Sequence, residues 1–256
     1  MVMNAYHLGL SREDLRGAEI VLLPGDPFRV PRIAATLDND PIEIAHHREF
    51  RSALADLQGT AVLVTSTGIG GASAAIAIEE LAGLGVRTFL RIGTTGAIQP
   101  SVGVGDLIVA AGAVRLDGAS SQYAPLSFPA VADHRLVNEL IASAVSRKQD
   151  HHVGLVVSTD TFYPGQERYD SFTGYVPLSH QGTLEEWKRL GCLSYEMETA
   201  TLFTITRTMG LAAGAVLGVI VNRTTSEAVD SKVVANTEDR AIQCAAEAVR
   251  RLVATG

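Results

Sequence analysis

Short apolar runs rich in Val and Ile recur along the chain and set its basic pattern. They predict strands at 19–23, 61–65, 88–92, 107–111, 153–157 and 216–221. Because the runs are almost continuously hydrophobic, we expect strands that are covered on both faces.

Helical spacing of apolar residues fills several of the intervals between these runs. One helix is predicted at 73–84, where isoleucines and leucines recur among alanines before Gly85, and another at 196–209, before Gly210. A further apolar stripe marks a C-terminal helix and consists of Ile242, Ala245, Val249 and Leu252. Strand and helix alternate, and no repeat or Pro/Ser-rich linker interrupts them, so we predict one α/β domain over residues 1–256.

Composition and charge narrow the class of protein. The chain is 46% hydrophobic and carries a net charge of −7, so it offers no basic field for a nucleic acid. Cys192 and Cys244 lack metal-ligand or redox spacing, and we interpret them as buried apolar residues. The N-terminus does not resemble a signal peptide, and the longest apolar run, 210–221, is too short to span a bilayer. We therefore expect a soluble cytoplasmic protein with neither nucleic-acid nor membrane partners.

Several predicted strands lead directly into turns that carry glycine or arginine. These turns are at 24–29, 66–71, 91–96 and 222–224. Functional residues of α/β folds usually lie on loops at strand ends. One pocket built from several such loops explains the repeated pattern.

The glycine-rich turn at 68–73 follows a predicted strand and opens a helix, as a dinucleotide fingerprint would. Its sixth position is Ser73, however, and no acidic residue ends a second strand about 20 residues on. It is either a tight strand-to-helix connection or a helix N-terminus that binds an anion or a sugar oxygen.

Three arginines, Arg29, Arg48 and Arg91, are candidates for holding an anion against the overall negative charge. A guanidinium matches phosphate with a planar fork of donors. Arg91 ends an apolar strand, where a charge needs a partner, and Thr94 adds a hydroxyl nearby. A buried ion pair or a solvated surface arginine is the alternative.

Two further segments carry polar recognition chemistry. In 162–169, Gln166 and Arg168 could match the carbonyls and N–H of a uracil edge, with Phe162 covering the ring; otherwise the segment is only a polar loop. Glu196 and Glu198 open the predicted helix at 196–209, where they serve either the helix dipole or ribose hydroxyls.

Together these residues resemble the nucleoside phosphorylase family, and within it the hexameric members that act on uridine. The resemblance covers nearly the whole chain. Its motifs are His-Leu-Gly-Leu at 7–10, Pro-Gly-Asp-Pro at 24–27, His-Arg-Glu-Phe at 47–50, and the segments 66–71, 89–100, 114–120, 160–169, 195–198 and 219–224. The resemblance implies a central mixed β-sheet or distorted barrel flanked by helices.

The resemblance also implies a role for each site residue. Phosphate would be bound by Gly25, Arg29, Arg91 and Thr94, with Arg48 from a neighbouring subunit. The base would contact Phe162, Gln166, Arg168, Ile220, Val221 and Arg223. Ribose would contact Thr94, Glu196, Met197 and Glu198, with His7 from a neighbouring subunit. The residues expected to act in catalysis are Arg91, Gln166, Arg168 and Arg223.

The expected reaction is the reversible phosphorolysis of uridine, and more weakly of deoxyuridine and thymidine, to uracil and the pentose 1-phosphate. No cofactor is implied, since phosphate is a co-substrate. The resemblance further implies a homohexamer arranged as a trimer of dimers, with K⁺ at the dimer interface near Glu49, Ile69 and Ser73. The segment 225–235 is expected to act as a flap, although it lacks the proline of similar enzymes.

Two alternatives differ in substrate or in turnover. A purine nucleoside phosphorylase or nucleosidase typically places an aspartate after the strand predicted at 216–221, but here Asn222 and Arg223 follow. A nucleoside-binding protein without turnover would not need a second anion site.

Overall fold

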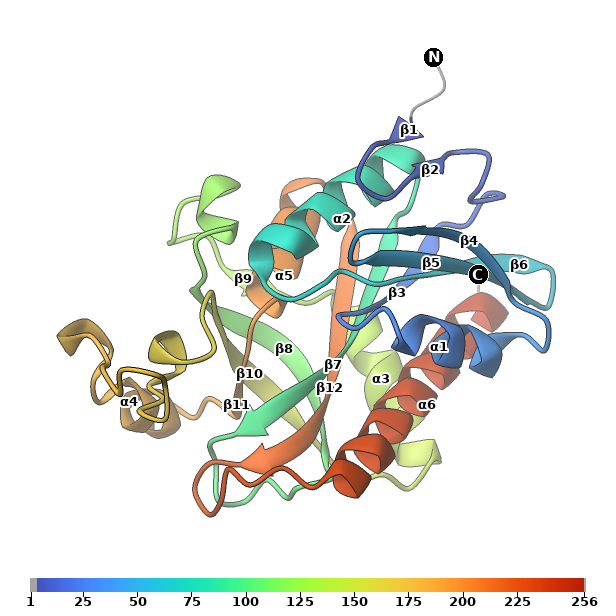
Figure 1. The fold of residues 1–256 in the computed structure, drawn as a ribbon. Coiled ribbons are helices and arrows are strands. Elements are labelled where there is room, and N and C mark those ends of the chain that lie inside the picture. Colours follow the sequence, from blue (N-terminus) through green and yellow to red (C-terminus); the bar gives the residue numbers. More distant parts are fainter. Residues whose placement is uncertain (1–3, 256) are drawn as a thin grey trace.

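The computed structural model describes residues 4–255 and is organised around one long mixed sheet (Figure 1). In spatial order the strands are β11 (Ser194–Glu196), β10 (His151–Thr159), β8 (Leu107–Leu116), β12 (Ala212–Asn222), β7 (Thr88–Ala97), β3 (Ile20–Pro24), β6 (Thr60–Thr65), β5 (Phe50–Leu57) and β4 (Ile42–His47). The short β9 (Ala130–Val131) pairs with β8, and β1 (Asn4–Ala5) forms a separate hairpin with β2 (Leu10–Ser11).

Half of this sheet closes on itself. β11 pairs parallel with β10 and antiparallel with β7, so the end of the strand order returns to its middle. The ring therefore runs through β7, β12, β8, β10 and β11, and the remaining strands extend from it. The prediction of a mixed sheet or distorted barrel is confirmed.

Helices cover both faces of the sheet and form its two larger hydrophobic cores, and a small third cluster surrounds Tyr195. They are α1 (Arg29–Leu37), α2 (Gly71–Leu84), α3 (His134–Ser146), α4 (Thr183–Arg189), α5 (Thr199–Thr208) and α6 (Ser231–Thr255), with 3₁₀ turns at Ser120–Gln122, Pro164–Gln166 and Leu178–His180. One core packs α2 and α5 against the sheet, and the other packs α1, α3 and α6 (Figure 1). Burial on both faces explains why the strands read as unbroken apolar runs.

Some boundaries differ from the predictions in ways that matter for the site. The strand expected at 88–92 continues to Ala97, so Thr94 lies within β7 and not in a turn. The helix expected at 196–209 begins only at Thr199, because Glu196 belongs to β11. Prediction missed the antiparallel pair β4–β5, whose outer strand β4 alternates too weakly to be recognised.

The N-terminal segment, which looks irregular in sequence, is ordered around an acidic side chain. The backbone N–H groups of His7 and Leu8 donate to the carboxylate of Glu80 on α2, at 2.9–3.0 Å.

No helix among residues 4–255 combines the length and apolarity that a bilayer crossing requires.

Candidate active site

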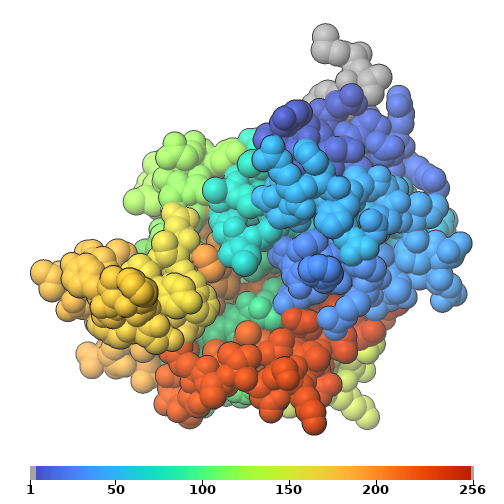
Figure 2. Space-filling model, in the orientation of Figure 1, coloured from blue at the N-terminus to red at the C-terminus, as the bar shows by residue number. Residues whose placement is uncertain are grey.

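A cavity of about 260 Å³ opens where the closed part of the sheet meets the loops that follow its strands. Figure 2 shows the hollow between the blue N-terminal third, the yellow residues around 165–180 and the red C-terminal segment. Its lining comes from β7, β11 and β12, from the start of α1, and from the loops after β3, β10 and β12.

One end of the cavity gathers the groups predicted to hold an anion. We call this the anion end; it is lined by Gly25, Arg29, Arg91 and Thr94. Arg29 stands at the first residue of α1, and the Nε atom of its side chain is buried without a hydrogen-bond partner among the described residues. A buried donor of this kind is ready to meet an anionic acceptor.

Arg91 reaches the cavity because of a glycine two positions later on the same face of β7. A Cβ atom added to Gly93 would lie 2.9 Å from Nη2 of Arg91 and 2.7 Å from Leu217. Only a residue without a side chain leaves room for the guanidinium to fold across the strand. The first glycine of the Gly-Thr-Thr-Gly sequence therefore has a steric role within β7 and does not form a turn.

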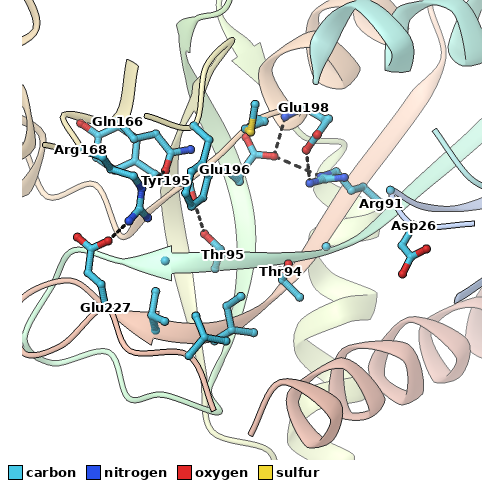
Figure 3. A pocket seen from close by; sticks show the side chains of 18 of the residues that line it. Asp26, Arg91, Thr94, Thr95, Gln166, Arg168, Tyr195, Glu196, Glu198 and Glu227 are labelled. Atoms are coloured by element: carbon cyan, nitrogen blue, oxygen red, sulfur yellow. Dashed lines mark hydrogen bonds and ion pairs between the residues drawn. The ribbon is translucent and has the colours of Figure 1, made fainter. Parts of the chain in front are cut away.

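Two carboxylates neutralise Arg91 in the middle of the cavity (Figure 3). Its Nη2 donates to Glu198, and its Nε lies 3.3 Å from Oε2 of Glu196. All three side chains are almost fully buried. A buried cation and its counter-ions are tolerable only when they are paired in this way.

The two carboxylates differ in how many of their oxygen atoms are already hydrogen-bonded to groups other than Arg91. Oε2 of Glu196 accepts the backbone N–H groups of Glu198 and Thr199 at 2.9 Å, and its Oε1 accepts the hydroxyl of Ser158. Glu196 therefore lines the cavity, binds the backbone N–H groups at the start of α5 and supports Arg91. It lies in β11 and not in the first turn of the helix, where the helix-dipole interpretation had placed it.

Glu198 is the more adaptable of the pair. Its Oε1 accepts the N–H of Gly70 at 2.5 Å, and its other oxygen faces Arg91. Burial raises the pKa of Glu198, an effect that Arg91 opposes and Glu196 reinforces. The contact also gives the turn at 68–73 a role, since its backbone holds a site carboxylate.

The opposite end of the cavity contains the predicted recognition residues. We call it the amide end; it is lined by Phe162, Gln166 and Arg168. Gln166 and Arg168 are 3% and 7% exposed, and Nε of Arg168 lies 3.4 Å from Oε1 of Gln166. The guanidinium of Arg168 stacks 4.1 Å from the centroid of the Phe162 ring. Burial lowers the pKa of Arg168.

Apolar groups complete the wall between the two ends. They are Met197, Ile220, Val221 and Val229. All the predicted base and ribose residues considered so far therefore lie around one cavity.

Arg223, which was predicted to contact the base, is not among the residues that line the cavity. Its Nη1 donates to the backbone carbonyl of Gln166 at 2.7 Å, and its Cζ lies 5.5 Å from the ring centroid of Tyr195. Burial, followed by the charge of Arg168, lowers the pKa of Arg223 to about 10. Within this chain Arg223 fixes the recognition loop from behind.

The two residues predicted to act from a neighbouring subunit do not line this cavity. Arg48 is exposed at the tip of the β4–β5 hairpin, in the left-handed region with φ 58°. His7 is half-exposed, with Nδ1 2.6 Å from Oε1 of Glu80.

The three residues predicted near a cation lie together on the surface. Ser73 donates to Oε1 of Glu49 at 3.0 Å and to the carbonyl of Thr67 at 2.6 Å, while Ile69 is 78% exposed. These are oxygen ligands of the type that hard cations prefer. Among residues 4–255, no cluster of His, Cys, Asp or Glu could hold a metal ion by itself.

The lining residues that were not anticipated are Asp26, Gly93, Thr95, Gly96, Tyr195, Glu227 and Val229. Thr95 shares the face of β7 with Arg91, so period-two alternation from Arg91 could have found it. Glu227 lies in the segment set aside as a flap, and nothing in its sequence context signals a site residue.

The closed α/β sheet and this cavity define an enzyme site for a small polar substrate together with an anion. Residues 19–254 match the family described as the Phosphorylase superfamily, and the chain belongs to this family. It is 53% identical over 250 residues to the uridine phosphorylases of Salmonella typhimurium and Escherichia coli K12, covering 98% of each chain. It is also 40% identical over 210 residues to the guanosine phosphorylase of Halorubrum lacusprofundi, covering 82% of this chain and 80% of that one.

Proposed function

We propose that the protein is a pentosyltransferase that catalyses the reversible phosphorolysis of uridine to uracil and ribose 1-phosphate. The observation that carries the proposal is one cavity with arginines at its anion end and a buried Gln166–Arg168 pair at its amide end (Figure 3). The similarity to uridine phosphorylases over 98% of the chain supports the same substrate. Deoxyuridine and thymidine are expected to react more weakly.

Phosphate binds at the anion end in this account. Arg29 and Arg91 supply charged donors, and Thr94 and the backbone of Gly25 add neutral ones. Bound phosphate both attacks C1′ of the ribose and places negative charge opposite the cationic sugar that forms as the C1′–N1 bond breaks. Holding the two reactants together can contribute up to roughly 7–11 kcal/mol.

Ribose occupies the middle of the cavity, beside Glu198 and Met197. A carboxylate only accepts hydrogen bonds, so Glu198 suits the two ribose hydroxyls. In the structure Arg91 engages one oxygen of Glu198. When bound phosphate draws Arg91 toward itself, that oxygen becomes free to accept a hydrogen bond from the ribose hydroxyls. Glu196 keeps Arg91 and the start of α5 in place.

Uracil lies at the amide end, where Gln166 and Arg168 donate to its carbonyl oxygens. The electron pair of the broken C1′–N1 bond passes to the uracil ring, whose oxygens then carry negative charge. Donors aimed at charge that develops in the transition state contribute about 3–4 kcal/mol each. Phe162, Ile220 and Val221 provide the apolar faces that a planar base requires.

We further propose a homohexamer, a trimer of dimers, in which Arg48 and His7 complete the site of a neighbouring subunit. Both are accessible on the surface away from their own cavity, which such an arrangement requires. K⁺ would be held at the dimer interface by oxygens of Glu49 and Ser73 and the backbone of Ile69. The activity needs no cofactor in this account, and the enzyme acts in the cytoplasm.

The hydrogen bonds of Asn222 argue against a purine substrate. Its Nδ2 donates to the carbonyls of Gln99 and Val102, at 2.9 and 2.7 Å, and its Oδ1 accepts from Thr224. The side chain is committed to the fold and does not line the cavity, so the residue at the position of the purine enzymes' aspartate cannot protonate a purine nitrogen.

The test is release of uracil from uridine with and without phosphate, alongside inosine, guanosine and adenosine. We expect uracil only when phosphate is present and no base from the purine nucleosides. Equal release without phosphate would indicate a hydrolase. Tight uridine binding with no product at any phosphate concentration would indicate a binding protein.

A further inference from the structure

Glu227 reaches into the amide end from the segment between β12 and α6. It lines the cavity, and its carboxylate bridges both buried arginines there. Oε2 is ion-paired with Nη1 of Arg168 (Figure 3). Oε1 lies 2.8 Å from Nε of Arg223. The segment is anchored at its start by a bridge between Asn222 and Ser226.

The two arginines do not depend on Glu227 in the same way. Arg223 also donates from Nη1 to the carbonyl of Gln166 and from Nη2 to that of Glu167, so backbone contacts hold its guanidinium without Glu227. Arg168 uses Nε toward the side chain of Gln166, while its terminal Nη1 is taken by Glu227. Glu227 therefore occupies a donor of Arg168, a residue that lines the cavity.

A carboxylate and a uracil carbonyl are both hydrogen-bond acceptors. Both are drawn to the guanidinium of Arg168, Glu227 with its carboxylate charge and uracil with the charge that it gains as it leaves. The ion pair with Glu227 uses Nη1, so a base carbonyl on that side of the guanidinium competes with Glu227 for it. Since the side chain of Glu227 is 38% exposed, its carboxylate can withdraw into water at little desolvation cost.

We propose that Glu227 is an internal competitor for the base, which fills the donor of Arg168 in the empty site and must be displaced when uracil or uridine binds. It thereby shields two adjacent buried cations in the empty enzyme and sets the affinity for a carbonyl-bearing base. This inference rests on the proposed function, because it assumes that the base lies against Arg168.

The test compares Glu227→Gln and Glu227→Ala with the parent protein and with Glu185→Gln. Glu185 forms exposed ion pairs with Lys188 and Arg189 on α4, remote from the cavity lining. Calorimetry with free uracil reports the amide end without chemistry. Because a partly exposed ion pair is weak, we expect both Glu227 variants to bind uracil about three- to tenfold more tightly, with Glu185→Gln unchanged. The KM for uridine should fall without a rise in kcat.

The same substitution in an Arg168→Ala background separates competition from other effects. If Glu227 acts by occupying Arg168, Glu227→Gln should leave the uracil affinity of that background unchanged. Unchanged or weaker uracil binding by Glu227→Gln alone, or an equal gain without Arg168, overturns the proposal. A parent protein that fails to bind uracil at all contradicts the proposed function itself, and with it this inference.

Discussion

Arg29 and Glu238 join the anion end of the cavity to the C-terminal helix: Nη2 of Arg29 lies 2.5 Å from Oε1 of Glu238. The second oxygen of Glu238 accepts from Nη1 of Arg32 at 3.0 Å, so the carboxylate is itself held in place. Unlike Glu227, Glu238 does not line the cavity, and it leaves Nε of Arg29 without a partner. We therefore expect it to orient Arg29 and not to compete with bound phosphate.

Replacing Glu238 with Ala should weaken phosphate binding more than turnover. Losing the charge-assisted hydrogen bond that orients Arg29 corresponds to about a tenfold rise in the KM for phosphate. With saturating phosphate, kcat should stay within about twofold of the parent value, since the chemistry of the base is untouched. Initial rates at varied phosphate measure both constants.

Asp239→Ala is the matched control for this substitution. Asp239 pairs with Arg32 at 2.7 Å, but it has no contact with Arg29. Equal effects of the two variants on the KM for phosphate would show that the positioning role of Glu238 is wrong.

Arg168→Ala should remove a donor that stabilises the leaving uracil. We expect kcat to fall by about 100-fold or more, because the interaction strengthens as charge reaches the base oxygens. Steady-state rates with uridine test this, and Arg189→Ala, on the exposed face of α4, serves as a control. A near-normal kcat would leave base activation unexplained.

The raised pKa of Glu198 predicts the acid limb of the pH profile. Burial favours the neutral acid, whereas the carboxylate is the form that accepts ribose hydroxyls. As pH falls through the raised pKa, Glu198 is protonated and kcat/KM should decline. The midpoint of this limb should lie above the value of about 4.3 that is typical of an exposed glutamate.

The Glu198→Gln variant tests whether Glu198 is the group that causes the acid limb of the pH profile. The variant cannot ionise at this position, so its remaining activity with uridine should lack the same acid limb. An unchanged limb in Glu198→Gln, or a parent midpoint at or below about 4.3, would place the titrating group elsewhere.

Asn222→Asp should destabilise the fold without giving activity on purines. The substitution sets a carboxylate oxygen against the carbonyls of Gln99 and Val102, which now accept from Nδ2. A lost buried donor costs about 1–3 kcal/mol. At roughly 2–4 °C per kcal/mol for a domain of this size, the melting temperature should fall by several degrees.

Thermal unfolding and an inosine assay check the two parts of this prediction. Asn236→Asp, at an exposed position on α6, is the control and should melt close to the parent protein. Inosine cleavage by Asn222→Asp would show that the side chain reaches the base after all.

Hydrophobic runs were enough to predict the parallel part of the fold. Strands such as β3 and β12 are buried on both faces, and their short Val- and Ile-rich runs favour strands over helices. The exposed pattern of β4 carries no comparable signal, because its stability comes from pairing with β5. Closure of the sheet through β11 depends on a three-residue strand that no periodicity could identify.

The site was predictable where residue chemistry alone is distinctive, as for the buried charge of Arg91 in an apolar strand and for the pair Gln166 and Arg168 in the loop after β10. The distinct roles of Glu196 and Glu198 were not predictable, since they depend on which carboxylate oxygens the fold has already engaged. Glu227 and Glu238 were missed for a similar reason: each acts through an arginine that is distant in sequence.

The most direct measurement of the central claim is ³¹P NMR of a reaction containing uridine and phosphate. The account predicts that ribose 1-phosphate appears in a one-to-one ratio with uracil, and that adding uracil to the isolated sugar phosphate regenerates uridine. Formation of free ribose with no change in the phosphate signal would contradict the account.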